Sequence, residues 1–143
     1  MSAAPETLAV ERFPETLAVV RLGPGAEVPG WAESSSLFSI TATARETSVV
    51  CARRSVPKKA QQAGPFTAFA VKGPLDFSLT GILAALLVPL AEVEISVFTI
   101  STYDTDWILV PVDEADRAAD EWRRRGHDVA PAIPTTPEEN KRA

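Results

Sequence analysis

Two acidic side chains in the second half of the chain, Asp104 and Asp106, have the chemistry to bind a cation. They lie in the run Ser-Thr-Tyr-Asp-Thr-Asp, which connects two segments with a strand-like pattern. Carboxylates form charge-assisted hydrogen bonds with ammonium or guanidinium groups, and these are stronger than hydrogen bonds between neutral groups. The neighbouring Thr102 and Tyr103 add a hydroxyl, a carbonyl or an apolar wall. The alternative to a binding role is that the two aspartates simply lie on an exposed hairpin turn. Of the two, we select Asp104 as the candidate acid.

A second candidate binding element is the turn Ser-Leu-Thr-Gly-Ile, which precedes the longest apolar segment of the chain. The start of a helix there presents backbone N–H groups without intrahelical partners and the positive end of the helix dipole. Glycine has no Cβ, so a ligand can approach the backbone closely. The alternative is that this glycine lets the helix pack against a strand. The candidate residues are Ser78, Thr80, Gly81 and Ile82, and with Asp104 they suit a zwitterion such as an amino acid.

Residues that usually carry catalysis or hold metals are scarce in the sequence. His127 is the only histidine and Cys51 the only cysteine, and no spacing suits a zinc site or a phosphate-binding loop. Two carboxylates without a companion base, metal or cofactor make a poor catalytic set. We therefore predict no enzyme activity, no catalytic residue, no metal and no cofactor.

Composition narrows the class of protein further. The chain has 143 residues, 45% of them hydrophobic, and a formal net charge of -5, which disfavours nucleic acid and anionic membranes as partners. Residues 1–11 lack a signal-peptide pattern, and the apolar stretch 82–91 is far shorter than the ~20 residues that span a bilayer. A single cysteine fits a reducing compartment. These features predict a cytoplasmic protein.

Both candidate binding elements lie in the second half of the chain, so the secondary structure of that half must position them. The pattern of hydrophobic and turn residues is also clearer there than in the first half. Apolar periodicity and turn residues predict a β-α-β-β-α-β order. The predicted elements are strand 66–72, a helix from near Ser78 that contains Pro89, strands 95–102 and 107–112, helix 113–125 and strand 127–130. This order is the α+β, ferredoxin-like arrangement, with two helices on one face of a four-stranded antiparallel sheet. The first half or a second copy of the chain should cover the other face, so we expect a homodimer.

The residue pattern of the first half predicts short strands at 7–10, 16–22, 37–44 and 47–52, followed by a polar linker at 55–64. A boundary near Gly64 divides the chain into residues 1–64 and 65–130. Residues 131–143, with three prolines and many charges, form a predicted disordered tail.

A family resemblance adds to this interpretation. The segments that carry it are Phe77–Leu83, Pro89–Ala91, Ile95–Phe98 and Ile100–Val110. They resemble the ACT-domain proteins of the CASTOR-type group, which includes stand-alone bacterial proteins and animal arginine sensors. The resemblance covers roughly residues 8–129. It implies a C-terminal ACT domain preceded by a degenerate ACT-like half.

The resemblance also implies an amino-acid ligand held between the two halves. By motif match, Ser48 and Val49 lie where the other half of the family touches the ligand. We therefore predict a small-molecule-binding regulatory or sensor protein. The alternative is a protein-interaction or dimerisation module that needs no ligand.

Overall fold

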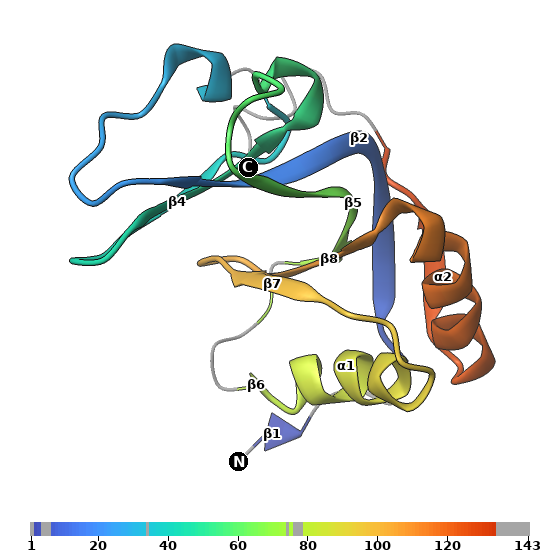
Figure 1. Cartoon of the computed structure of the whole chain (residues 1–143). Coiled ribbons are helices and arrows are strands. Elements are labelled where there is room, and N and C mark those ends of the chain that lie inside the picture. Colours follow the sequence, from blue (N-terminus) through green and yellow to red (C-terminus); the bar gives the residue numbers. More distant parts are fainter. Residues whose placement is uncertain (1, 4–6, 34, 74, 76–78, 134–143) are drawn as a thin grey trace.

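Two long antiparallel strands, β2 (Ala9–Leu22) and β5 (Gln62–Val71), run through both halves of the chain and organise the fold. The computed structural model describes residues 2–3, 7–33, 35–73, 75 and 79–133. Figure 1 shows β2 as a long blue strand that changes direction sharply near its middle. The pairing of β2 with β5 shifts register between Arg12 and Thr16, at the segment that contains Pro14. Such irregularities bend a strand and increase its twist.

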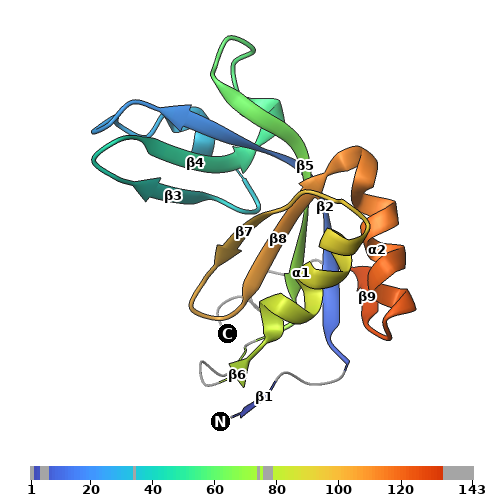
Figure 2. The same cartoon turned by 60° about the horizontal axis from the view of Figure 1, so that its bottom comes forward.

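The bend gives one curled sheet two arms (Figure 2). The first arm contains β3 (Ser39–Ala42), β4 (Thr47–Ala52) and the later part of β2. The second arm contains β8 (Asp106–Pro111), β7 (Phe98–Ser101) and β9 (Asp128–Pro131) together with the first part of β2 and the later part of β5. The first residues of β5 pair with the later part of β2 and belong to the first arm. Along the sheet the order is β3-β4-β2-β5-β8-β7, and β9 pairs with β2 in parallel.

Helices α1 (Ile82–Glu92) and α2 (Ala115–Arg124) pack against the second arm. The apolar side chains of both helices lie at helical spacing and are buried against alternate residues of the strands, among them Phe69 and Ile108. Trp122 is fully buried, lies edge-on to Phe69 at a centroid distance of 4.9 Å, and donates its indole N–H to the Leu86 carbonyl at 2.8 Å.

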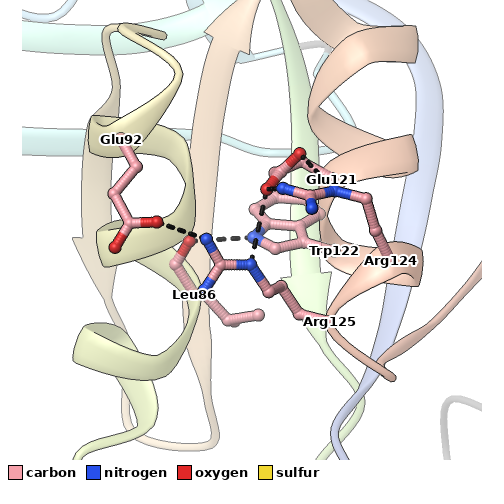
Figure 3. Close-up of polar contacts among 6 residues, drawn as sticks. All are labelled: Leu86, Glu92, Glu121, Trp122, Arg124 and Arg125. Carbon is pink, nitrogen blue, oxygen red and sulfur yellow. Dashed lines mark hydrogen bonds and ion pairs between the residues drawn. The ribbon is translucent and has the colours of Figure 1, made fainter.

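Ion pairs reinforce the contact between the helices at its solvent side (Figure 3). Arg125 of the α2 C-terminus bonds Glu92 at the end of α1 and also contacts Glu121. Arg124 pairs with the same Glu121 carboxylate. Although burial opposes it, the hydrogen bond from Arg124 is the largest influence on Glu121 and lowers the pKa of that carboxyl. The helix pair is therefore held by a buried indole and by a charge cluster at one end.

Two further apolar clusters occupy the first arm and the interior of the curl. Leu17, Val50, Ala68 and Leu109 are buried inside the curl, between the two arms. On the outer face of the first arm, Val20, Val49 and Cys51 pack under the short helix η1 (Gly30–Glu33), near η2 (Arg53–Ser55). Burial raises the pKa of the Cys51 thiol, and the nearby Glu15 adds to this effect. Cys51 is thus a residue of the core.

The remaining elements are short. Helix η3 (Val112–Glu114) leads into α2. Strands β1 (Ser2–Ala3) and β6 (Leu79–Thr80) form a separate parallel pair, which brings the start of the chain beside the start of α1.

The predicted α+β class with an antiparallel sheet is confirmed, and so is the β-α-β-β-α-β order of the second half. The predicted four-stranded sheet is wrong, because β2 inserts between β5 and β9 and makes the second arm five-stranded. The strands predicted at 7–10 and 16–22 are one bent strand. Helix α1 begins at Ile82 rather than near Ser78, which lies outside the described residues.

The boundary predicted at Gly64 falls inside β5, so the sheet is continuous across it and the division into two halves stays a prediction. The predicted linker is wrong in its last residues, because β5 already begins at Gln62. Pro131 of the predicted tail belongs to β9, and residues 134–143 lie outside the described part.

Candidate functional site

The first turn of α1 and the connection between β7 and β8 enclose a hollow of about 360 Å³, here called the first hollow. It brings together five of the residues selected from the sequence, which lie about twenty positions apart along the chain. These residues are Gly81, Ile82, Thr102, Tyr103 and Asp104. The other lining residues are Leu75, Leu83, Ala84, Ser101, Thr105 and Asp106.

The helix side of the first hollow is a set of backbone donors. Gly81 is the N-cap residue of α1, with φ of 78°, and no side chain caps this end of the helix. A left-handed backbone conformation favours glycine, which explains the residue type at this position. The first four N–H groups of a helix have no intrahelical acceptor, and here they belong to residues 81–84, all of which line the hollow. The positive end of the helix dipole adds to the attraction for an anion.

The opposite side of the first hollow is a tight turn held by its own hydrogen bonds. The Thr102 N–H and hydroxyl both donate to the Thr105 carbonyl, at 2.8 and 3.0 Å. The Ser101 hydroxyl donates to the Asp106 carboxylate at 2.7 Å. The Thr102 hydroxyl and the Asp106 carboxylate are thus already used within the turn.

Asp104 sits at the tip of this turn, and its backbone fixes the turn to the rest of the site. The Leu75 N–H donates to the Asp104 carbonyl at 2.7 Å, and a Cβ added at Gly73 would lie 3.0 Å from the same oxygen. The Asp104 side chain is exposed and lines the hollow. Among the described residues it makes no ion pair, so its carboxylate is available to a ligand.

The charge of the first hollow is one-sided. Among the lining residues that the structure describes, Asp104 and Asp106 are the only charged ones, and none is Lys, Arg or His. An acidic ligand would meet two carboxylates without a cation to offset them. A zwitterion with a basic side chain suits the hollow better, because its carboxylate can accept from the helix N–H groups while its cation faces Asp104.

The structure does not bring Ser48 and Val49 into the first hollow. The Val49 side chain is fully buried in the cluster on the outer face of the first arm. Ser48 lines two other hollows, of about 320 and 230 Å³. The smaller one shares the lining residue Ser101 with the first hollow. The contribution of the first half to this site therefore stays a prediction.

Two further residues that were selected from the sequence are not among the described lining residues of the first hollow. Thr80 belongs to β6 and does not line the hollow, and Ser78 is outside the described residues. Leu83 and Ala84 line it but were not selected from the sequence. A count of the four N–H groups without intrahelical partners, starting at Gly81, includes both.

Within residues 2–3, 7–33, 35–73, 75 and 79–133, no group of three or more His, Cys, Asp or Glu side chains is arranged to hold a metal ion. No helix in the same part of the chain has the length and apolar character to cross a membrane.

Family models match two segments of the chain. The ACT domain model matches residues 64–120, and a model that describes an N-terminal domain matches residues 15–59. The cytosolic arginine sensor for mTORC1 subunit 1 from Rattus norvegicus is 41% identical over 61 residues. That stretch covers 43% of this chain but only 18% of the sensor.

Solved structures extend the likeness to the whole fold. Protein Atu0741 from Agobacterium tumefaciens has a TM-score of 0.82 and 28% identity, over 93% of this chain and 99% of that one. The regulatory subunit of aspartate kinase from Thermus flavus shares only the fold, with a TM-score of 0.57 and 8% identity over 82% and 96% of the two chains. Residues 64–120, which supply every lining residue of the first hollow, therefore match the ACT domain family.

Proposed function

We propose that this protein is a regulatory sensor of the CASTOR-type, stand-alone kind that binds an amino acid in the first hollow. The observation that carries the proposal is the arrangement of four free helix N–H groups opposite Asp104 across one hollow. The ACT domain match and the similarity to an arginine sensor support the same class of ligand. The proposal assigns the chain no catalytic step, and a cytoplasmic location remains part of it.

The basic amino acid arginine is the first ligand to test. Its carboxylate would accept from the N–H groups of the first turn of α1, and its guanidinium would donate to Asp104. The hollow, at about 360 Å³, has room for a ligand of this size. Both interactions are charge-assisted, and each typically contributes about 1.5–3 kcal/mol.

The experiment is a thermal-shift and calorimetric titration of the full chain with L-arginine. At a free concentration of 100 times Kd, arginine should stabilise the fold by about 2.7 kcal/mol. Asp104→Asn should weaken binding by about tenfold, because a neutral acceptor replaces a charged one. Asp113→Asn is the matched control, since Asp113 is exposed on η3 outside the hollow.

Arginine binding that is unaffected by Asp104→Asn would place the ligand elsewhere. No stabilisation by any of the amino acids would contradict the sensor function itself.

We further propose that the active form is a homodimer in which β7 pairs with a second copy. Strand β7 is an edge of the sheet and carries neither a charged residue nor a proline to protect it. Next to it, Val97 is 38% exposed and Tyr103, at the first hollow, is 80% exposed. A partner along β7 would cover both and complete the wall of the hollow.

Light scattering tests this part separately. The chain should be a dimer, and Thr99→Lys at the edge should make it monomeric, because a charge at an edge strand opposes strand pairing. A monomeric wild-type chain would contradict the dimer. A dimer without any ligand response would instead favour the ligand-independent assembly module.

A further inference from the structure

A second hollow, of about 320 Å³, lies on the inner face of the first arm and shares no lining residue with the first hollow. Its polar lining residues are Arg21, Glu46, Ser48, Gln61 and Gln62, and its apolar ones are Val19, Val20, Ala63 and Phe98. It therefore combines a cation, an anion, a hydroxyl and an apolar surface in a space of amino-acid size.

Strand pairing explains why the polar groups gather there. Arg21 of β2 is directly opposite Ser48 of β4 in the antiparallel register, so their side chains point to the same face of the sheet. Glu46 precedes Ser48 by two residues, and side chains two apart along an extended segment also share a face. Diagonal neighbours of this kind are about 7–8 Å apart, within reach of long side chains, yet no ion pair joins Arg21 and Glu46 among the described residues.

The two charges are not used elsewhere in the described part of the chain. The Arg21 guanidinium has one contact, a long one of 3.4 Å from Nη2 to the Arg45 carbonyl. The Glu46 backbone bonds to Thr43, but its carboxylate accepts no hydrogen bond and joins no ion pair among these residues. By contrast, Glu15 and Arg54 on the same arm neutralise one another. A guanidinium and a half-buried carboxylate that face one hollow without pairing are suited to the two ends of a single zwitterion.

The apolar part of the second hollow defines the rest of the ligand. Val19 and Phe98 are half-buried and belong to the cluster inside the curl. No second charge lies beside them, so a charged side chain would lose hydration there without a partner. An aliphatic side chain would cover Val19 and Phe98 instead.

We propose that the second hollow is a distinct binding site for an aliphatic α-amino acid. The ligand carboxylate pairs with Arg21, its ammonium group with Glu46, and its side chain packs on Phe98. This site stands independently of arginine binding in the first hollow, because the two share no residue. The hollow of about 230 Å³ shares Ser48 and Phe98 with the second hollow and Ser101 with the first.

The test is a titration of the isotope-labelled full chain with L-leucine, followed by the backbone amide signals in NMR. L-Leucine should shift the signals of Arg21, Glu46, Ser48 and Phe98 in a saturable way. N-Acetyl-L-leucine lacks the ammonium group and L-leucinamide lacks the carboxylate, so each should bind at least tenfold more weakly. Arg21→Gln and Glu46→Gln should each weaken L-leucine binding by a similar factor.

Arg45→Gln is the matched control, because it removes a neighbouring exposed arginine that does not line the hollow. It should leave L-leucine binding unchanged. The absence of saturable shifts at the four residues would overturn the second site. So would equal binding of leucine and its two derivatives, or an effect of Arg45→Gln as large as that of Arg21→Gln.

Failure of this site and failure of the sensor function can be told apart in the same samples. Arginine binding is read from the amide signals of Gly81 and Asp104, and Arg21→Gln should leave it intact. Melting temperatures of all variants show whether a lost signal reflects unfolding instead.

Discussion

Replacing Gly81 by alanine tests whether the start of α1 is built for a ligand or only for folding. Gly81 has φ of 78°, in the left-handed region that non-glycine residues adopt at a cost of roughly 1–2 kcal/mol. Alanine also makes the unfolded chain less flexible, which offsets about 0.4–1 kcal/mol of that cost. The net loss of stability should be about 1 kcal/mol. For a chain of 143 residues this lowers Tm by roughly 3–4 °C.

Gly25→Ala provides the control for backbone strain. Gly25 has φ of 72°, no atom within 4 Å of an added Cβ, and no place in the lining of the first hollow. Both variants should lose similar stability in thermal unfolding. Only Gly81→Ala should also weaken arginine binding, because relief of the strain moves the N–H groups of the first helical turn. Gly81→Asn, which tolerates the left-handed region better, should recover part of both losses.

Two results would refute this reasoning. If Gly81→Ala bound arginine as tightly as the wild type, the helix start would not contact the ligand. If Gly81→Ala were as stable as the wild type while Gly25→Ala was not, the conformation at position 81 would not be the strained one described here.

Three other perturbations address the fold that positions the site. The Leu8 N–H donates to Nδ1 of the buried His127 at 3.0 Å, so His127→Leu should cost about 1–3 kcal/mol by leaving that N–H unpaired, measurable by urea unfolding. Trp122→Phe removes the indole N–H that bonds the α1 backbone, and should lower the free energy of unfolding by about 1–3 kcal/mol. Burial opposes ionisation of Glu15, but a backbone N–H and Arg54 hydrogen-bond its carboxylate and lower its pKa. That stability is present above the ordinary pKa of glutamate and is lost as pH falls through the lowered value, so the drop in Tm between pH 5 and 3 should be smaller in Glu15→Gln.

Local sequence patterns predicted the helices and strands well where the signals for an element lie within the element and its immediate neighbours along the chain. The strand at Thr47–Ala52 was predicted to the residue, because β-branched residues end at a polar turn on each side. The apolar face of α2 and the glycine after it likewise fixed the second helix. Both signals depend only on neighbours along the chain.

The pairing of β2 could not be predicted in the same way. Because of Pro14 and the register shift beside it, the sequence of β2 has the pattern of two short strands separated by a break, although the structure contains one strand there. Its insertion between β5 and β9 joins residues far apart in the sequence, and no local period encodes such a choice. The candidate site shows the same limit: the helix start and the Asp104 turn were each recognised locally, whereas the position of Ser48 depended on how the sheet curls.

Strands β2 and β5 both continue from one arm of the sheet to the other, and this restricts how a sensor of the proposed kind could transmit a signal. A clamshell closure needs a flexible joint between two bodies, whereas here the two arms share a pair of strands rather than a free linker. If the proposed sensor binds its ligand, occupancy would then be detected at a surface that changes locally, such as the turn that carries Asp104 or the free edge of β7, rather than through a large movement of one half toward the other.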